Sequence, residues 1–306
     1  MSEDKATEAD SVCASPTQKH GEGPKYSQNS DQRYPLSFSR ARLKVRLKDF
    51  WNSQEVYWSL LTEELASNSG ARARAASFIP EGSRILDVAC GRAANCVWLL
   101  DRGKYFGCDI SHTGLRHAQR PGLHLVCADA EALPFADRSF DAVLCTYAIE
   151  HSVNPVQMLS EMIRVVCPGG RIVLLGPCWD FPFWFPNSLQ SKTRSFIGRC
   201  QFALSRFAGQ FAAVLFDRLP FLIVEEPDAF ALPFVVDADA VYIAWSYEII
   251  RLLNRSGCRL QCAEVDTQLL GSNPFVRLLK RVLMILPMYR YAGSTVLLVF
   301  DRGDAV

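Results

Sequence analysis

The sequence lacks a long uncharged segment and an excess of charge of either sign. Its longest run without Asp, Glu, Lys or Arg is 11 residues, 181–191, whereas a membrane-spanning helix needs about 20 apolar residues. The 33 Lys and Arg residues nearly balance the 32 Asp and Glu residues, and proteins that follow nucleic-acid phosphates carry a basic excess. We therefore expect no membrane span and no nucleic-acid partner.

Paired cysteine motifs are also absent. The chain has 11 cysteines, an odd number, and no two of them are separated by two residues. Cys258 and Cys262 have no second Cys or His pair near them in sequence, so we predict no metal site. The N-terminus is acidic and polar, which is not typical of a secretory signal. We expect reduced cysteines and a cytoplasmic protein, with contact to a membrane surface left open.

Composition divides the chain into three parts. Residues 1–35 contain no Leu, Ile, Phe or Trp, so they cannot bury enough apolar surface to offset ordering entropy and are predicted to be disordered. Residues 36–79 are predicted to be a basic, then aromatic, helical lead-in. The basic run either contacts anionic lipid or phosphate or is a solvated helix face, and the balanced overall charge favours the second. Residues 80–306 are predicted to form the main domain, with insertions at about 178–237 and 267–293.

Between residues 84 and 177, short apolar runs alternate with turns and longer amphipathic runs. The apolar runs expected to be strands are 84–88, 105–108, 123–127, 141–145 and 171–175. Helices are predicted at about 93–101, 113–119 and 156–165, the last ended by Pro168-Gly169-Gly170. This alternation is typical of a parallel sheet with crossover helices, so the sequence predicts a doubly wound α/β fold.

The C-terminal part begins with an aromatic and proline-rich stretch, 179–186. Beyond it we predict a helix at 238–254, a strand at 259–265, an amphipathic helix at 275–288 and a strand at 294–300. Phenylalanines between residues 181 and 216 form either a lid for a lipid-like substrate or membrane surface, or the core of the insertion. Near-helical spacing among the later ones favours the core.

Acidic residues close the first three expected strands at similar intervals. Asp87 begins the stretch Asp87-Val88-Ala89-Cys90-Gly91, where small residues let a ligand approach the backbone. Asp109 follows 22 residues later, the separation at which a carboxylate accepts hydrogen bonds from ribose hydroxyls, and Asp129 follows after another 20. Aspartate often merely caps turns, but the joint register of the three favours a nucleotide-type site.

Six short stretches, in order, carry a family pattern. They are 85–91, 107–111, 128–135, 139–141, 149–151 and 168–170. Together they resemble the class I S-adenosylmethionine-dependent methyltransferases, in the branch whose glycine loop reads Leu-Asp-Val-Gly-Cys-Gly. The likeness covers about residues 80–177. It implies a Rossmann-like, mostly parallel sheet of seven strands and the cofactor S-adenosylmethionine.

The resemblance also implies roles for individual residues. Ala89, Cys90 and Gly91 correspond to the loop under the methionine part of the cofactor, with Asp87 at the start of the motif. Asp109 corresponds to the carboxylate that binds the ribose. The other implied cofactor contacts are Ile110 beside the adenine ring, Asp129 with Ala130 as the adenine clamp, and Tyr147 after the fourth strand.

Glu150 and His151 are the candidate catalytic residues. A histidine at the carboxyl edge of the sheet has a pKa near neutral and is suited to take a proton from a substrate hydroxyl. The same pair also fits a structural lead-in to the following helix. We therefore carry both interpretations forward to the structure.

The sequence thus predicts a methyltransferase that transfers a methyl group to an oxygen of a saccharide-containing or lipid-like small molecule by direct displacement. Ala93 and Arg92 stand where the family has glycine and a small residue, and we expect them to narrow the pocket. That feature supports an alternative, a non-catalytic binding or scaffold protein of the same fold. A nicotinamide-dependent oxidoreductase is disfavoured because the glycine triplet of dinucleotide-binding proteins is absent. The acceptor and the oligomeric state stay open.

Overall fold

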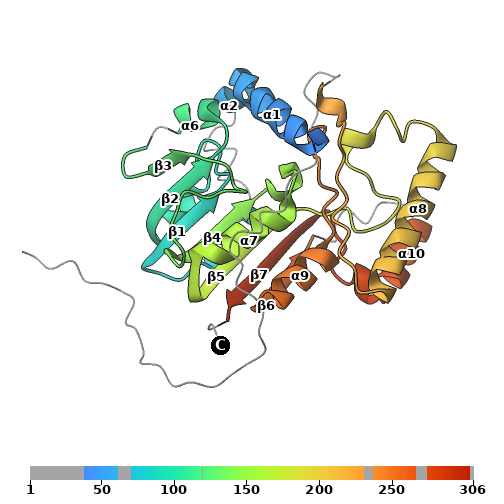
Figure 1. Ribbon diagram of the computed structural model, residues 1–306. Helices are drawn as coiled ribbons and strands as arrows, with labels where there is room; N and C mark the ends of the chain where they lie inside the picture. Colours follow the sequence, from blue (N-terminus) through green and yellow to red (C-terminus); the bar gives the residue numbers. More distant parts are fainter. Residues whose placement is uncertain (1–37, 61–69, 119, 231–236, 267–273, 304–306) are drawn as a thin grey trace, which may run out of the picture. The chain divides into compact units, whose positions relative to one another are not determined.

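A seven-stranded sheet runs through the chain. The structure is a computed structural model, and it describes residues 38–60, 70–118, 120–230, 237–266 and 274–303. The strands are β1 (Ser83–Val88), β2 (Gly103–Asp109), β3 (His124–Cys127), β4 (Phe140–Thr146), β5 (Val166–Pro177), β6 (Cys258–Val265) and β7 (Thr295–Arg302). Their order is β3-β2-β1-β4-β5-β7-β6, with β1 to β5 parallel and β7 antiparallel to both neighbours (Figure 1). The predicted doubly wound, mostly parallel sheet is confirmed.

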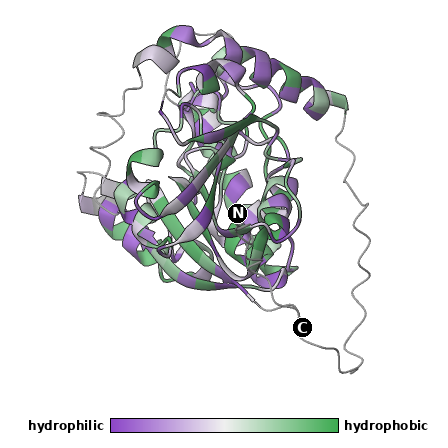
Figure 2. Cartoon of the chain, turned by 90° about the vertical axis from the view of Figure 1, so that its left-hand side faces the viewer, coloured by the Kyte–Doolittle hydropathy of each residue, from purple (hydrophilic) through white to green (hydrophobic). Residues whose placement is uncertain are grey.

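Helices pack on both faces of this sheet. They are α1 (Phe38–Ser53), α2 (Glu55–Leu60), α4 (Gly70–Ser77), α5 (Cys96–Leu99), α6 (His112–Arg116), α7 (Pro155–Val165), α8 (Phe196–Leu215), α9 (Ser246–Arg255) and α10 (Pro274–Leu283). Short 3-10 helices are η1 (Ile149–His151), η2 (Asn187–Leu189), η3 (Asp228–Phe230) and η4 (Pro287–Tyr289). Figure 2 shows that the outer helices carry hydrophilic and hydrophobic residues along their length. Among the described helices, none is long and apolar enough to cross a membrane.

Strand residues alternate between two hydrophobic clusters, as the pleat of a strand requires. Leu86 and Val143 contribute to the cluster that contains side chains of α7 and α9. Ile85 and Leu144 contribute to the cluster that contains side chains of α4 and α5. Because both faces are covered, the central strands read as continuous apolar runs in the sequence, which is why their positions could be predicted.

Two of the predicted helices in the first half are shorter than expected. Residues 93–95 form turns, with Ala93 at a φ of 59°, so only Cys96–Leu99 of the expected segment 93–101 is helical. The segment expected at 113–119 is helical from His112 to Arg116. The helix expected at 156–165 is confirmed as α7, whose N-cap Asn154 accepts a hydrogen bond from Gln157 N–H. Pro168-Gly169-Gly170 lies within β5 rather than in a separate turn.

The prediction of a helix from residue 238 was wrong, since α9 begins only at Ser246. Residues 238–245 are all buried, whereas a surface helix buries only one face. Their apolar residues are therefore explained by complete burial and not by a helix. Their backbone pairs with distant segments: Val241 and Tyr242 both donate to the carbonyl of Glu150, at 2.8 Å each. The predicted amphipathic helix at 275–288 is also interrupted, because α10 ends at Leu283 and Pro287 starts η4.

A buried polar network attaches α8 to the rest of the fold. The Arg206 guanidinium donates to the carbonyls of Phe181, Trp184 and Trp179. The nearby Asp180 carboxylate accepts hydrogen bonds from the backbone and hydroxyl of Ser246, at 2.8 and 2.6 Å. These bonds satisfy charged groups that would be costly to bury alone.

The predicted disordered leader, 1–35, lies outside the described residues. Every described residue belongs to one compact unit, Tyr34–Ala305. The proposed division at residue 80 and the limits of the two insertions stay predictions.

Candidate functional site

The strand order reverses between β1 and β4. After β1 the chain adds β2 and β3 on one side and then returns to place β4 on the other side. The loops that leave β1 and β4 therefore diverge, and sheets of this kind bind ligands in the crevice that results. A cavity of about 1110 Å³, counting the part open to solvent, is lined by residues from the carboxyl ends of β1 to β4. A cavity at this edge of a doubly wound sheet is a typical place for a small-molecule site.

Most of the residues assigned to the cofactor from the sequence meet in this cavity. Those on its wall are Ala89, Cys90, Gly91, Asp109, Ile110, Asp129, Ala130, Tyr147 and the candidate catalytic residue His151. Asp87 and Glu150 are buried and do not line the cavity. Any role of these two carboxyl groups in the site is therefore indirect.

Asp109 holds the loop after β1 in place. Its Oδ2 accepts a hydrogen bond from Gly91 N–H at 2.8 Å, and its Oδ1 accepts one from Ser111 N–H at 2.7 Å. Burial raises the pKa of Asp109, and these two backbone bonds oppose the shift. A carboxylate has about four acceptor positions, so each oxygen keeps one for a ligand. The geometry fits a ribose with two adjacent hydroxyl groups.

The loop after β1 takes left-handed backbone conformations at three positions. Their φ values are 55° at Ala89, 56° at Gly91 and 59° at Ala93. Alanine adopts this conformation at a cost of about 1–2 kcal/mol. Ala89 and Ala93 therefore follow the backbone path of a glycine loop but have less conformational freedom than glycine. This path brings Ala89, Cys90 and Gly91 to the cavity wall.

Ala93 and Arg92 do not narrow the cavity, contrary to our expectation. Neither residue lines it. Ala93 is 1% exposed and packs in the core cluster beside α5. Arg92 turns away and donates a hydrogen bond to the carbonyl of Trp58 at 2.9 Å. The observation that favoured a scaffold protein is therefore removed.

Asp87 acts on the cavity through a neighbouring amide. Both of its oxygens lie 3.1 Å from Asn95 Nδ2, and Tyr105 OH donates to one of them at 2.8 Å. Asn95 lines the cavity and contacts Thr146 Oγ1 and an Arg72 guanidinium nitrogen at 2.9 and 2.8 Å. Burial raises the pKa of Asp87 to about 6, against the hydrogen bonds from Tyr105 and Asn95. Asp87 is thus a positioning residue.

His151 lies between two buried carboxyl groups. Its Nδ1 is 3.0 Å from Asp239 Oδ2, and its Nε2 is 3.8 Å from Glu150 Oε1. Burial alone would lower the pKa of His151, but Asp239 and Glu150 outweigh it and raise that pKa to about 10. Burial raises the pKa of Glu150 to about 7, and its Oε2 has no hydrogen-bond partner among the described residues. The two carboxyl groups therefore favour the protonated form of His151.

Aromatic side chains from α1 and α2 form another wall. Trp51, Tyr57 and Trp58 line the cavity, and their ring centroids lie 4.9 to 5.4 Å apart. The Trp51 ring meets His151 edge to face at 5.5 Å. Trp58 is 6% exposed and packs against the loop, since a Cβ on Gly91 would lie 2.8 Å from its ring. These rings form an aromatic wall beside the loop after β1.

Lys44 of α1 closes the side of the cavity near β3. Its ammonium group contacts Asp129 Oδ2 and lies 2.6 Å from Glu131 Oε2. Burial would lower the pKa of Lys44, but Glu131 and Asp129 outweigh it and raise that pKa. The carboxylate predicted to clamp adenine is thus already paired with a cation.

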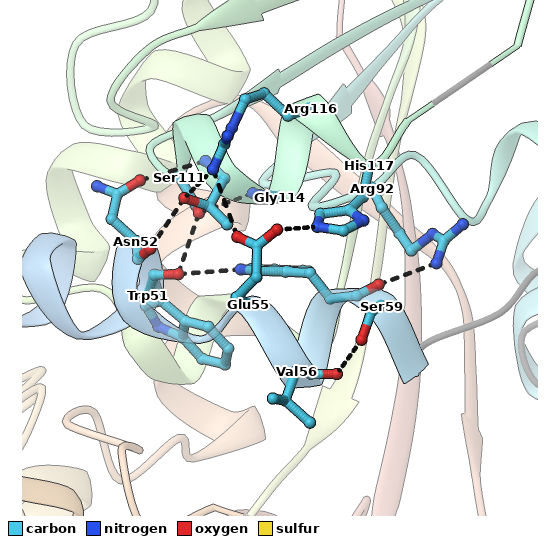
Figure 3. Close-up of polar contacts among 12 residues, drawn as sticks. Trp51, Asn52, Glu55, Val56, Ser59, Arg92, Ser111, Gly114, Arg116 and His117 are labelled. Carbon is cyan, nitrogen blue, oxygen red and sulfur yellow. Dashed lines mark hydrogen bonds and ion pairs between the residues drawn. The ribbon is translucent and has the colours of Figure 1, made fainter.

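Hydrogen bonds tie the aromatic wall to α6. Figure 3 shows Ser111 Oγ donating to the carbonyl of Trp51 at 3.2 Å, next to the Asn52 and Glu55 contacts. Thr113 Oγ1 donates to the Asn52 carbonyl at 2.9 Å, and Glu55 lies 2.9 Å from His117 Nε2. The helices α1, α2 and α6 lie together beside the sheet (Figure 1). The lead-in is therefore part of the site.

Sequence reasoning missed several wall residues: Lys44, Trp51, Tyr57, Trp58, Arg72 and Asn95. The aromatic run after residue 49 was visible, but nothing in the sequence indicates which loop it covers. Asn95 carried a usable signal, because it follows the loop after β1 within the expected helix start. Among the described residues, no group of three or more His, Cys, Asp or Glu is arranged to hold a metal ion.

Comparison with known proteins supplies the family. Residues 86–174 match the model of a methyltransferase domain. The chain carries a class I S-adenosylmethionine-dependent methyltransferase domain. This agrees with the resemblance seen in the sequence, and S-adenosylmethionine is the cofactor of this domain family. The nicotinamide alternative is thereby removed.

Curated relatives match about a third of this chain. A demethylmenaquinone methyltransferase of Beutenbergia cavernae is 41% identical over 109 residues, which is 34% of this chain and 44% of the relative. The phthiotriol/phenolphthiotriol dimycocerosates methyltransferase 1 of Mycobacterium ulcerans is 38% identical over 122 residues, 37% of this chain and 45% of the relative. The chain thus spans less than half the length of these relatives.

Solved structures support the fold. A chain from the complex of the Haloferax volcanii Trm112 methyltransferase activator has a TM-score of 0.53 and 15% identity, covering 85% of this chain and 99% of that one. The Burkholderia thailandensis 1,6-didemethyltoxoflavin-N1-methyltransferase, with bound S-adenosylhomocysteine, has a TM-score of 0.50 and 13% identity, covering 88% and 92%. At these identities, the likeness concerns the fold alone.

Proposed function

We propose that this protein is a methyltransferase that uses S-adenosylmethionine to methylate a lipid-like small molecule, on oxygen. One observation carries the cofactor part of the proposal: Asp109, fixed by two backbone N–H groups, lines a cavity at the carboxyl ends of the parallel strands. The reaction and the acceptor rest on further arguments, given below.

The residues on the wall divide among the parts of the cofactor. Asp109 would bind the ribose hydroxyls, and Ile110 and Ala130 would contact the adenine ring. The loop of Ala89 and Gly91 would pass along the methionine part. The Asp129 carboxylate, paired with Lys44, would act on adenine only through its free acceptor positions.

The acceptor is proposed from the cavity wall and the relatives. Trp51, Tyr57, Trp58 and Met158 make part of the wall aromatic or apolar, which suits an apolar acceptor. The two curated relatives are named for demethylmenaquinone and for phthiotriol/phenolphthiotriol dimycocerosates. A saccharide-containing acceptor has less support, since neither name includes a saccharide.

S-adenosylmethionine, when bound, supplies a methyl group that is already activated for displacement. The protein then has to align the acceptor oxygen and exclude water. The rings of Trp51, Tyr57 and Trp58 exclude water, and His151 faces the acceptor space beside Trp51. With a pKa of about 10, the His151 imidazolium is matched to a phenol-type hydroxyl, whose pKa is also about 10. We propose that the neutral form of His151 accepts the proton that the acceptor hydroxyl loses, and that Asp239 and Glu150 stabilise the resulting imidazolium.

The first test is titration calorimetry of the purified protein with S-adenosylhomocysteine, using NADH as the control ligand. Binding of S-adenosylhomocysteine alone supports the proposal. Failure to bind would refute the cofactor site and return the protein to the scaffold class.

The role of His151 is tested with the pH dependence of turnover on a phenolic acceptor. The productive complex has one proton shared between His151 and the acceptor hydroxyl, so it has lost one proton relative to the form that dominates at neutral pH. We therefore expect kcat/KM to rise about tenfold per pH unit up to roughly pH 10. His151→Ala should remove most turnover while leaving S-adenosylhomocysteine affinity nearly unchanged. Equal losses in both would show that His151 is structural.

A further inference from the structure

Helix α8 has an inverted distribution of polarity. A surface helix normally buries its apolar stripe and exposes its polar residues. In α8 the buried residues are Arg206, Gln210 and Ala213. Phe202 and Val214 pack inward, but most of the large apolar side chains point outward, with exposed fractions of 81% for Phe196 and 56% for Phe211. The fold therefore does not use the apolar stripe of this helix, and the favoured interpretation of the later phenylalanines as the core of the insertion was wrong.

The large apolar side chains that α8 exposes lie on a single stripe. At about 100° per residue, positions 196, 200, 204, 207, 211 and 215 fall within roughly one third of the helix circumference. The exposed large apolar residues of the helix are Phe196, Ile197, Leu204, Phe207, Phe211 and Leu215. A stripe of this width is the form in which a helix presents an apolar face to a partner.

Helix α10 repeats the inversion. Lys280 is 8% exposed, and its ammonium group lies 4.7 Å from the ring centroid of Trp184, where burial lowers its pKa. Leu278 and Val282 are 60% and 53% exposed, and Ile285 just beyond the helix is 80% exposed. The helix thus buries a lysine and exposes leucine and valine.

The two helices belong to one region of the molecule. Side chains of α8 and of residues 283–292 share a small core around Phe181 and Trp245. Tyr289 OH and Gln210 Oε1 are 2.9 Å apart, and α8 and α10 lie next to each other in Figure 1. Of the 17 large apolar side chains exposed in the described residues, 14 lie in 183–222 and 278–286. We call the exposed residues of these two segments the α8–α10 surface.

The α8–α10 surface is basic at its margins. Exposed basic residues in and beside it are Lys192, Arg194, Arg199, Arg218, Arg277, Arg281 and Arg290. Residues 181–222 and 274–291 together contain one acidic residue, Asp217. That carboxylate is already paired with Arg251 and Arg255. The surface is therefore cationic in a chain whose net charge is only +1.

We propose that the α8–α10 surface binds an anionic lipid bilayer, with the phenylalanine and leucine side chains entering the interface and the arginines contacting the headgroups. Amphipathic helices with Phe and Leu on one face and Lys or Arg beside it lie in membrane interfaces in this way. A second copy of the chain is a poorer occupant, because the same seven basic groups would face each other in a symmetric pair. The surface would hold the enzyme where an apolar acceptor is dissolved. This extends the proposed function but does not depend on it.

The experiment is co-sedimentation of the full-length protein with vesicles of phosphatidylcholine, with and without phosphatidylglycerol. We expect strong binding only to the anionic vesicles, weakened by added salt. Phe207→Glu/Phe211→Glu should reduce the partition coefficient by about tenfold or more, because burying one phenylalanine contributes that much. Arg277→Gln/Arg281→Gln should produce a similar loss on anionic vesicles only.

Val56→Glu is the matched control, because Val56 is 70% exposed on α2, outside the α8–α10 surface. The proposal is overturned if the wild-type protein does not bind anionic vesicles, or if Val56→Glu reduces binding as much as the phenylalanine variant. It is also overturned if the protein is a dimer that the phenylalanine variant dissociates while vesicle binding is unchanged. Titration with S-adenosylhomocysteine in the same preparations reports the cofactor site separately, so failure of one proposal is distinguishable from failure of the other.

Discussion

Replacement of Asp109 by asparagine tests the centre of the proposed cofactor site. The carboxylate accepts Gly91 N–H on one oxygen and Ser111 N–H on the other. An asparagine amide has one acceptor oxygen, so one of the two buried N–H groups would face the amide NH2 instead. A buried unsatisfied donor costs about 1–3 kcal/mol. We therefore expect Asp109→Asn to lower the free energy of unfolding by about this amount.

The same substitution removes a charged partner for the ribose. Hydrogen bonds to a charged group contribute about 1.5–3 kcal/mol, and 1.4 kcal/mol corresponds to a tenfold change in Kd. The affinity for S-adenosylhomocysteine should thus fall by about 10- to 150-fold. Titration calorimetry at a temperature well below the variant's unfolding transition measures this directly.

Asp141→Asn is the control, because the Asp141 carboxylate also accepts a backbone N–H, that of Arg84, at 2.8 Å. These two residues lie at the opposite edge of the sheet, where β4 and β1 begin. Asp141→Asn should leave the affinity for S-adenosylhomocysteine unchanged. An unaltered Kd in Asp109→Asn, with the protein folded, would refute the assignment of Asp109 to the ribose.

Two further outcomes follow from the same geometry. Gly91→Ala should lower the free energy of unfolding by roughly 2 kcal/mol or more, because the new Cβ would lie 2.8 Å from the Trp58 ring and the φ there is 56°. Gly122→Ala is the control, since its Cβ would meet open space at a φ of 85°. In urea unfolding it should lose only about 1 kcal/mol. Burial raises the pKa of Glu248 to about 7 in the folded protein, so its contribution to stability is present below about pH 4.5 and is lost as the pH rises through about 7. Urea unfolding between roughly pH 5 and pH 8 should show a shallower decline in Glu248→Gln than in the wild type, and parallel curves would contradict this reasoning.

The strands could be predicted because they are buried on both faces and therefore form continuous apolar runs in the sequence. Leu86 and Val143 belong to continuous apolar runs, and each run is closed by a turn or an acidic residue. Asp109 and the loop at Gly91 could be placed at the cavity for a similar reason, since strand ends and loop residues are local in sequence. The segment 238–245 could not be assigned, because its burial on all sides comes from backbone pairing with Glu150 and Leu222.

By itself, then, the sequence determined the doubly wound sheet, the family of its domain and most of the cavity wall along the strand ends. Those features depend on periodicity and on residues close together in the chain. The tertiary structure alone decided what covers the cavity: Lys44 reaches Glu131, 87 residues away, and Trp58 packs on Gly91. It alone decided that the pKa of His151 is raised, because that shift depends on Asp239, 88 residues along the chain. Contacts at such separations leave no local pattern, because the packing of whole elements determines them.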